Sequence, residues 1–249
     1  MRLENKVAIV TGAASGFGAE IARQYALEGA NVVVADMNGP GAAAVAAEIG
    51  GHAVGVTCDV TKRAEIDAMV ADTVKRFGTI DIVVNNAGWT HKNQPLLDVD
   101  EATFDKVYDI NVKSIFFMIH AVVPLMRAKR SGVILNIGST AGIRPRPGLT
   151  WYNSSKGAVN LMSKSLAVEL GGDNIRVNVI CPVMGATGLL ESFMGMPDTP
   201  ENRKKFIATI PMGRLSQPRD IARAAVYLAS DDAEFITGVE FPVDGGRTV

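Results

Sequence analysis

The chain has 249 residues, of which 47% are hydrophobic and 20% are charged, with a formal net charge of −1. This length suits one large α/β domain, so we expect residues 1–249 to form a single domain. The near-neutral charge gives no overall field for nucleic acid or an anionic membrane, and we expect neither as a partner. The two cysteines, Cys58 and Cys181, have no metal or redox spacing, so we expect buried thiols and no metal site.

Targeting signals are also not expected. The first apolar run, residues 7–10, is too short for the core of a signal peptide. The longest apolar stretch, residues 115–126, contains His120 and Pro124, and we expect no segment able to span a bilayer. The sequence therefore predicts a cytosolic (cytoplasmic) protein.

Short β-branched runs alternate along the chain with longer alanine-rich segments of helical period. The runs predict strands at residues 7–10, 32–34, 54–56, 80–84, 133–137, 177–180 and 238–243. The longer segments predict helices at residues 19–28, 41–49, 65–77, 104–128, 152–170 and 220–229. This alternation is typical of an α/β, doubly wound fold with a seven-stranded parallel sheet between two layers of helices.

One segment has no clear periodicity. Glycine, methionine and proline cluster in residues 184–200, between the sixth strand and a short helix. A segment beyond the carboxyl end of a strand borders the ligand site of such folds, so we expect a mobile substrate lid at about residues 184–210.

A glycine-rich turn follows the first strand. Gly12, Gly16 and Gly18 have the spacing Gly-x-x-x-Gly-x-Gly, with Ser15 and Phe17 between them, where a helix opens. Such a turn lets a pyrophosphate approach the backbone, and the helix N-terminus offers free N–H groups. An ordinary strand-to-helix turn can contain the same glycines, so this motif alone is weak evidence.

Asp36 gives a second, independent indication of a dinucleotide. It ends the second strand, 18 residues beyond Gly18, where a carboxylate accepts hydrogen bonds from the ribose hydroxyls of NAD and repels the extra phosphate of NADP. The alternative is a simple turn aspartate. Met37 follows it, so no basic residue stands there for a phosphate, and we predict NAD (NADH) as the cofactor, contacted by Asp36 and Met37.

Tyr152 and Lys156 lie four residues apart and share one face of a predicted helix. A free tyrosine has a pKa of about 10, and we expect the neighbouring ammonium to lower it toward a working pH for proton transfer. Ser139 follows the fifth strand, where it can stabilise charge on a substrate oxygen. An exposed helix face could carry the same Tyr and Lys pair without function.

These motifs occur in the order found in a known family. Asn85-Asn86-Ala87-Gly88 follows the fourth strand, Tyr152-x-x-x-Lys156 lies on the fifth predicted helix, and Asp244-Gly245-Gly246 closes the chain. Together with Asp59, Asn111 and Ser139, they make the whole chain resemble the short-chain dehydrogenase/reductase family.

The resemblance implies a Rossmann fold, a nicotinamide cofactor and a homotetramer built on helices 104–128 and 152–170. It implies that Asn111 orients a water that relays a proton and that Lys156 also binds the cofactor ribose. The implied catalytic tetrad is Asn111, Ser139, Tyr152 and Lys156, and further implied cofactor contacts are Asp59, Val60, Asn86, Ala87, Gly88 and Tyr152.

The chain departs from the family after the sixth strand. Pro182 is followed by Val183 where the family usually has glycine, and Gly185 stands where it has an aliphatic residue, while Thr187 is kept. We expect Pro182, Gly185 and Thr187 to border the nicotinamide, with the loop shifted by a residue or two.

Basic residues follow two of the strands that end at the predicted site. His91 and Lys92 come after the fourth strand, and Arg144 and Arg146 come after the fifth in a proline-rich loop. They suggest a substrate with an anionic group, because arginine binds carboxylates well. Rim charges or subunit contacts are the alternative. A further alternative is that Trp89 and Trp151 form apolar walls for a ring, with an arginine stacked on an indole and no anion involved.

The sequence therefore predicts an NAD-dependent oxidoreductase that transfers a hydride reversibly between its cofactor and a small secondary alcohol or ketone, with Tyr152 as general acid/base. One alternative is a 3-oxoacyl-carrier-protein reductase that uses NADPH, against which Asp36 counts. Another is a non-catalytic dinucleotide-sensing protein, which would have no need of the Tyr152 and Lys156 pair.

Overall fold

The computed structural model describes all of residues 1–249. It contains one seven-stranded sheet with the order β3-β2-β1-β4-β5-β6-β7, and every neighbouring pair is parallel. The strands are β1 (Val7–Thr11), β2 (Asn31–Asp36), β3 (Ala53–Thr57), β4 (Ile82–Asn85), β5 (Gly132–Ile137), β6 (Ile175–Pro182) and β7 (Glu240–Val243). The predicted doubly wound fold is confirmed, and its strand order reverses between β1 and β4, the place where such folds bind ligands.

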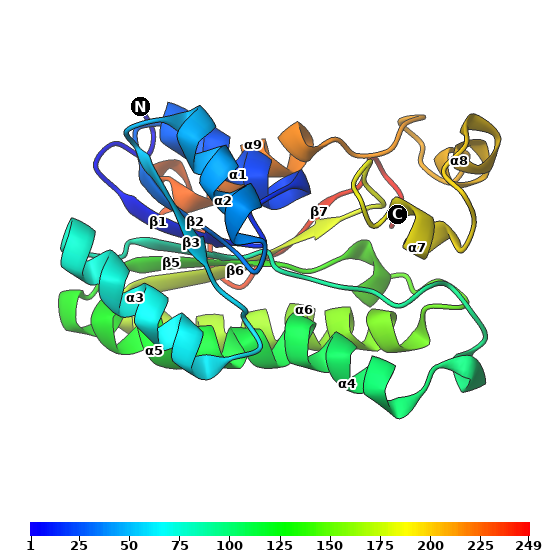
Figure 1. The fold of residues 1–249 in the computed structure, drawn as a ribbon, viewed down its shortest axis with the longest axis horizontal. Helices are drawn as coiled ribbons and strands as arrows, with labels where there is room; N and C mark the ends of the chain where they lie inside the picture. Colours follow the sequence, from blue (N-terminus) through cyan, green and yellow to red (C-terminus); the bar gives the residue numbers. More distant parts are fainter.

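Helices cover both faces of the sheet (Figure 1). One face carries α1 (Gly16–Leu27), α2 (Gly39–Ile49) and α9 (Pro218–Ala229), which pack with the sheet in a core of 25 buried residues. The other face carries α3 (Arg63–Phe77), α5 (Ser114–Lys129) and α6 (Thr150–Leu170), over a second core of 18 residues. Two cores separated by the sheet explain why the central strands are apolar at consecutive positions.

The long helix predicted at residues 104–128 has three parts. They are α4 (Glu101–Tyr108), a π-helical turn (Asp109–Lys113) and α5, which continues through Pro124. Together they form 29 helical residues, in which a window of 18 residues has a mean hydropathy of 1.4, long and apolar enough by composition to cross a membrane. This corrects the expectation that no such segment exists, since neither His120 nor Pro124 ends the helix. In the fold the apolar residues of α5 serve packing, because Met118, Val122 and Met126 are buried in the second core.

The segment expected to be irregular also contains helices. Residues 184–200 include α7 (Leu190–Met194), which periodicity did not predict, and α8 (Pro200–Ile207) follows. Both pack around a small core of their own, formed by Val183, Met184, Leu190, Met194, Ile210 and Leu215. This unit lies beside the carboxyl ends of β6 and β7 (Figure 1), and its movement as a lid stays a prediction.

Candidate active site

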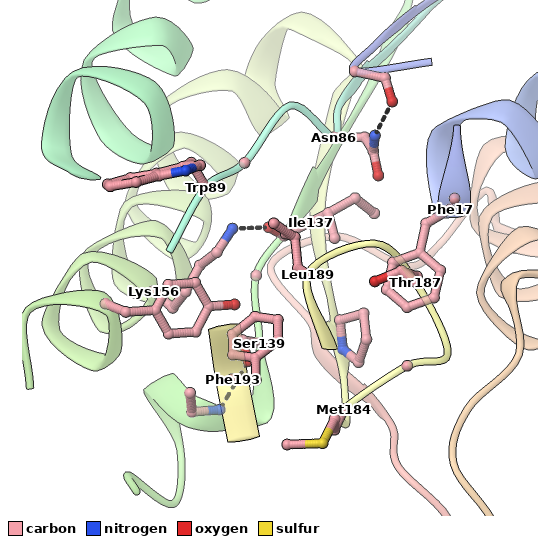
Figure 2. Close-up of a pocket in the computed structure, with 18 of the residues that line it drawn as sticks. Phe17, Asn86, Trp89, Ile137, Ser139, Lys156, Met184, Thr187, Leu189 and Phe193 are labelled. Carbon is pink, nitrogen blue, oxygen red and sulfur yellow. Dashed lines mark hydrogen bonds between the residues drawn. The ribbon is translucent and has the colours of Figure 1, made fainter. Parts of the chain in front are cut away.

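A cavity of about 320 Å³ opens at the carboxyl ends of the central strands. It runs from the glycine-rich turn after β1 to the first turns of α6 (Figure 2). Most residues that the sequence singles out meet here. Those lining the cavity are Gly12, Ser15, Gly16, Phe17, Asp36, Asn86, Ala87, Gly88, Ser139, Arg146, Tyr152, Lys156, Pro182, Gly185 and Thr187.

The glycine-rich turn presents the N-terminus of α1 to the cavity. The N-cap residue Ser15 makes no capping hydrogen bond, and the first turn of α1 contains no acidic residue. The first N–H groups and the positive end of the helix dipole are therefore free for an anion, as a dinucleotide pyrophosphate requires. Gly18 does not line the cavity, but a Cβ there would lie 2.4 Å from both the Gly12 carbonyl oxygen and Asn86 Nδ2. Its role is close packing.

The Asp36 carboxylate stands at the same end of the cavity. Its Oδ2 accepts a hydrogen bond from the Ala14 N–H at 3.0 Å, and its Oδ1 accepts one from the Asn38 N–H at 2.9 Å. Each oxygen keeps a lone pair, so the carboxylate fits a ribose diol without losing these bonds. Met37 is 73% exposed and lies outside the cavity lining.

Hydrogen bonds join the ends of β1 and β4. Asn86 Nδ2 donates to the carbonyl oxygens of Thr11 and Gly12 at 2.8 and 3.0 Å, while Thr11 Oγ1 accepts from the N–H groups of Asn86 and Ala87 at 3.1 Å each (Figure 2). The Asn86 amide therefore holds the two loops together. Thr11 completes this link, and sequence reasoning gave it no site role because a strand-end threonine carries no distinctive signal.

Asp59 and Val60 lie outside the cavity lining. Asp59 Oδ1 accepts hydrogen bonds from the N–H and hydroxyl groups of Thr61 at 3.0 and 2.7 Å. Burial acts to raise the pKa of Asp59, but these bonds and the charge of Lys62 outweigh it and lower the pKa. The adenine contact expected of Asp59 and Val60 stays a prediction.

Ser139 and the pair on α6 come together because Gly142 allows close packing. A Cβ at Gly142 would lie 2.8 Å from the Gly157 nitrogen, so glycine lets the turn after β5 rest directly on α6. Ser139 Oγ accepts a hydrogen bond from the Ala141 N–H at 3.0 Å, which leaves its own hydroxyl proton free to donate (Figure 2). Ser139, Tyr152 and Lys156 thus share one cavity wall.

Burial controls the proton affinities of both α6 residues. It raises the pKa of Tyr152 to about 12, although a hydrogen bond with Ser139 and the charge of Arg146 act to lower it. Burial likewise lowers the pKa of Lys156 to about 8. The expectation that the Lys156 ammonium brings the Tyr152 pKa toward neutrality is therefore corrected. Lys156 Nζ donates to the Ile137 carbonyl at 2.8 Å and lies 5.9 Å from the centre of the tyrosine ring.

Asn111 lies in the π-helical turn, outside the cavity lining, and a Cβ at Gly88 would lie 3.5 Å from its Oδ1. Its Nδ2 donates to the Trp89 carbonyl at 2.9 Å and to Ser155 Oγ at 3.0 Å, while its Oδ1 accepts from the Trp89 N–H at 2.8 Å. The side chain therefore positions the loop after β4 against α6. π-Helical turns are frequent at functional sites. The water-orienting role of Asn111 stays a prediction.

The loop after β6 explains the departure from the family pattern. A Cβ at Gly185 would lie 2.4 Å from Cζ of Phe17, the residue between the last two glycines of the turn after β1. The Phe17 ring occupies the space that an aliphatic side chain at residue 185 would need. Thr187 lies against Gly16, so the loop still covers the glycine-rich turn.

The basic residues predicted to bind substrate lie in different places in the structure. Only Arg146 lines the cavity. His91 is buried with Nδ1 bonded to the Lys92 carbonyl at 2.8 Å, and the Lys92 side chain is exposed. The exposed Arg144 instead donates to the carbonyl of Arg247 near the C-terminus, at 3.0 Å.

The aromatic walls differ from the expected ones. Trp151 Nε1 donates to the Leu96 carbonyl at 3.3 Å, outside the cavity lining, whereas Trp89 lines the cavity. Phe193 of α7 packs edge-on against Tyr152 with ring centres 5.1 Å apart. Sequence reasoning missed the other apolar residues on this side, namely Ala141, Leu149, Met184 and Leu189.

The structure contains no group of three or more His, Cys, Asp or Glu side chains arranged to hold a metal ion. Both cysteines are buried, and burial raises the pKa of the Cys58 thiol to about 11 and that of Cys181 to about 12. Neither thiol is therefore set up as a nucleophile.

Comparison with known proteins agrees with the geometry. Residues 12–248 match the family model described as enoyl-(acyl carrier protein) reductase. A 4-formylbenzenesulfonate dehydrogenase from Comamonas testosteroni is 48% identical, with 100% of both chains covered. A 7alpha-hydroxysteroid dehydrogenase from Escherichia coli K12 is 40% identical over 99% of this chain and 95% of the relative.

The same agreement holds in three dimensions. A crystal structure of 3-ketoacyl-(acyl-carrier-protein) reductase from Brucella melitensis, complexed with NADH, is 44% identical and superposes with a TM-score of 0.94, covering 99% of this chain and 100% of the other. The chain belongs to the short-chain dehydrogenase/reductase family. This family is one of oxidoreductases, and the NADH complex supports a nicotinamide cofactor.

Proposed function

We propose that this protein is an NAD-dependent oxidoreductase that interconverts a small alcohol and its carbonyl compound, with Tyr152 as general acid/base. The observation that carries the proposal is the shared cavity. Tyr152, Ser139 and Lys156 line one end, while the free N-terminus of α1 and Asp36 line the other. The proton-transfer residues and the residues suited to bind a dinucleotide thus line the same cavity.

The chain's own residues supply the proton and stabilise charge on the substrate oxygen. A nicotinamide cofactor, when bound, supplies or accepts the hydride. In carbonyl reduction the Tyr152 hydroxyl donates its proton to the substrate oxygen, and in alcohol oxidation the phenolate takes it back. The Ser139 hydroxyl donates a hydrogen bond to the same oxygen, because accepting a bond from the Ala141 N–H leaves its proton free.

Lys156 is placed to bind the cofactor. With its pKa near 8, it carries a positive charge at neutral pH and can hold the ribose of the cofactor beside the Ile137 carbonyl. The charge that acts to lower the Tyr152 pKa, and so favours the phenolate, is that of Arg146. The preference for NAD follows from Asp36, which would meet the extra phosphate of NADP with like charge.

The relatives support a carbonyl or secondary alcohol as substrate. One is named for an aromatic aldehyde and another for a hydroxysteroid, both ring compounds. Trp89, Leu149 and Phe193 give this cavity apolar walls that suit a ring. A relative named as an acyl-carrier-protein reductase keeps that activity as the second candidate.

The test is the Tyr152→Phe variant, which keeps the ring and removes the phenol. We expect kcat to fall by about a hundredfold or more, because the general acid is lost. NADH affinity, measured by fluorescence titration, should change little. Ring-bearing ketones and aldehydes should be assayed beside an acetoacetyl thioester. A variant that retains most activity would show that the proton travels by another route, and a wild type that prefers the thioester would favour the second candidate.

We also propose a cytosolic homo-oligomer, with a tetramer as the expected form. Apolar side chains are exposed along α5 and α6, among them Phe116 at 49%, Leu161 at 67% and Val168 at 85%. Exposed apolar rows of this kind suit burial against a second copy. Light scattering after gel filtration measures the oligomeric state directly.

A further inference from the structure

Arg146 is the unpaired cation of the cavity. Three charged residues line this space, and Asp36 and Lys156 are both hydrogen bonded to main-chain groups. The half-buried Arg146 side chain makes no ion pair and no hydrogen bond, and its guanidinium lies 5.8 Å from the centre of the Phe206 ring. Its backbone is fixed, because its carbonyl accepts from Asn153 Nδ2 at 2.8 Å.

A second arginine without a carboxylate partner lies close by. Arg247 also forms no ion pair, and its Nε is buried without a hydrogen-bond partner. The neighbouring Asp244 acts to raise the pKa of Arg247 but forms no salt bridge with it, and its oxygens accept three hydrogen bonds from Gly246 and Thr248. The Arg144 side chain holds the Arg247 carbonyl, which anchors this part of the chain.

The charge of Arg247 acts on Arg146. Burial lowers the pKa of Arg146, the charge of Arg247 lowers it further, and Tyr152 alone acts to raise it. A partly buried cation without an ion pair costs free energy, which an anion placed against Arg146 would recover. Arginine suits this task because its planar fork binds a carboxylate or sulfonate through two hydrogen bonds.

We infer that Arg146, supported by Arg247, is the specificity determinant for an anionic group on the substrate, a carboxylate or a sulfonate carried on the same small molecule as the reacting carbon. This inference rests on the proposed function and names its substrate class. Tyr152, Arg146, Leu149 and Phe193 line the same cavity, and Arg146 is close enough for its charge to act on the Tyr152 pKa. Arg247 was not expected from the sequence, since it lies 101 residues beyond Arg146.

The experiment compares charged and neutral substrates of one shape. We would measure kcat/KM for reduction of 4-formylbenzoate, 4-formylbenzenesulfonate and methyl 4-formylbenzoate. In Arg146→Gln the two anions should lose about 10- to 100-fold, the usual effect of removing a hydrogen bond between charged groups, while the ester changes by less than about threefold. Arg247→Gln should show the same selectivity with a smaller loss, and Arg146→Lys should restore part of the anion preference.

The matched control is Arg76→Gln. Arg76 is exposed in the last turn of α3, at the amino ends of the strands and so opposite the cavity, and its loss removes the same charge. It should leave the ratio of anion to ester unchanged. Thermal unfolding of each variant should stay near the wild type, because an unpaired cation contributes no ion pair. If the Arg146 or Arg247 variants instead lower stability or change the oligomeric state, with anion selectivity intact, the arginines serve the fold or an interface and the inference is wrong.

A binding measurement separates this inference from the proposed function. Calorimetric titration of 4-methylbenzenesulfonate, which has no carbonyl, into the NADH-loaded protein should give binding that Tyr152→Phe keeps and Arg146→Gln loses. Arginine-dependent binding without turnover of any carbonyl would overturn the proposed function and leave the anion site standing. Equal use of ester and acids by the wild type, with both arginine variants unaffected, would overturn the anion site alone.

Discussion

The cofactor end and the substrate end of the cavity differ in how completely their polar groups are paired. At the cofactor end, Thr11, Asn86 and Asp36 are all hydrogen bonded within the protein. Three buried side-chain atoms lack any partner, although none of their residues lines the cavity: His91 Nε2, Asn153 Oδ1 and Arg247 Nε. Buried polar groups are normally satisfied, so such exceptions call for an explanation.

This contrast indicates two kinds of preparation. At the cofactor end the side chains are paired within the protein before a ligand arrives, and the N–H groups of the first turn of α1 stay free for it. The substrate end keeps an unpaired cation, Arg146, with which an anionic substrate would pair. Mutations at the first end should therefore act on stability and cofactor affinity, and mutations at the second should act on selectivity.

The largest effect should come from Gly18→Ala. Its Cβ would meet the Gly12 carbonyl oxygen and Asn86 Nδ2, a fixed backbone and a side chain with two hydrogen bonds. Overpacking of this kind costs about 3 kcal/mol, and we expect a matching drop in unfolding free energy together with loss of NADH binding. Chemical denaturation and fluorescence titration measure the two effects.

The matched variant at the substrate end is Gly188→Ala. A Cβ there would have nothing within 4 Å, so stability should change by less than about 0.5 kcal/mol. If Gly18→Ala and Gly188→Ala lower the unfolding free energy equally, the cofactor end of the cavity is no more rigid than the substrate end.

The same contrast explains what the sequence could predict. The parallel sheet, its helices and the glycine-rich turn follow from periodicity and from spacing around fixed strand ends. The position of Phe17 against Gly185 depends on contact between loops 168 residues apart, and no local pattern encodes it. Likewise, Arg144 and Arg146 look alike in sequence, yet only Arg146 lines the cavity, because their side chains leave the same loop in different directions.

Proton affinities were the least predictable property of the site. The four-residue spacing of Tyr152 and Lys156 places them on one helix face, but it says nothing of their burial. Tyr152 is 6% exposed and Lys156 is 5% exposed, and this desolvation outweighs the neighbouring charges in both pKa values. Motif spacing therefore locates these groups without fixing their chemistry.

The second prediction concerns the cost of burying the Lys156 ammonium. Its pKa falls to about 8 in the folded protein, against about 10.4 when unfolded, so the folded state binds fewer protons between these values. Below pH 8 the charged form destabilises the fold, and this penalty disappears as the pH rises to about 10.4. Lys156→Met should therefore be more stable than the wild type at pH 7 by about 2 kcal/mol, after allowing for the lost bond to the Ile137 carbonyl.

The measurement is the difference in unfolding free energy between Lys156→Met and the wild type from pH 7 to pH 10.5, without cofactor. Taking the difference cancels the contributions of Tyr152 and of other groups that titrate in both proteins to the pH dependence of the unfolding free energy. Lys164→Met is the control, because Lys164 lies on the same helix and donates to Glu240 at the surface. A difference for Lys156→Met that stays constant with pH would mean that the buried ammonium carries no such penalty.

The smallest effect should be the cofactor preference set by Asp36. The wild type should favour NAD over NADP by more than about tenfold in kcat/KM, or about 1.4 kcal/mol, because the carboxylate meets the added phosphate with like charge and no basic side chain within 4 Å balances it. Asp36→Asn keeps an oxygen that can accept from the Ala14 or Asn38 N–H while removing the charge, so the ratio should move toward one mainly through better use of NADP. Asp67→Asn on α3 makes the same substitution in an exposed ion pair with Arg63 and should leave the ratio unchanged.

Equal use of both cofactors by the wild type would contradict the assignment of NAD preference to Asp36. A ratio that falls because NAD use collapses, with NADP use unchanged, would show instead that Asp36 acts by holding the glycine-rich turn, and the cofactor end would then owe its selectivity to rigidity rather than to charge.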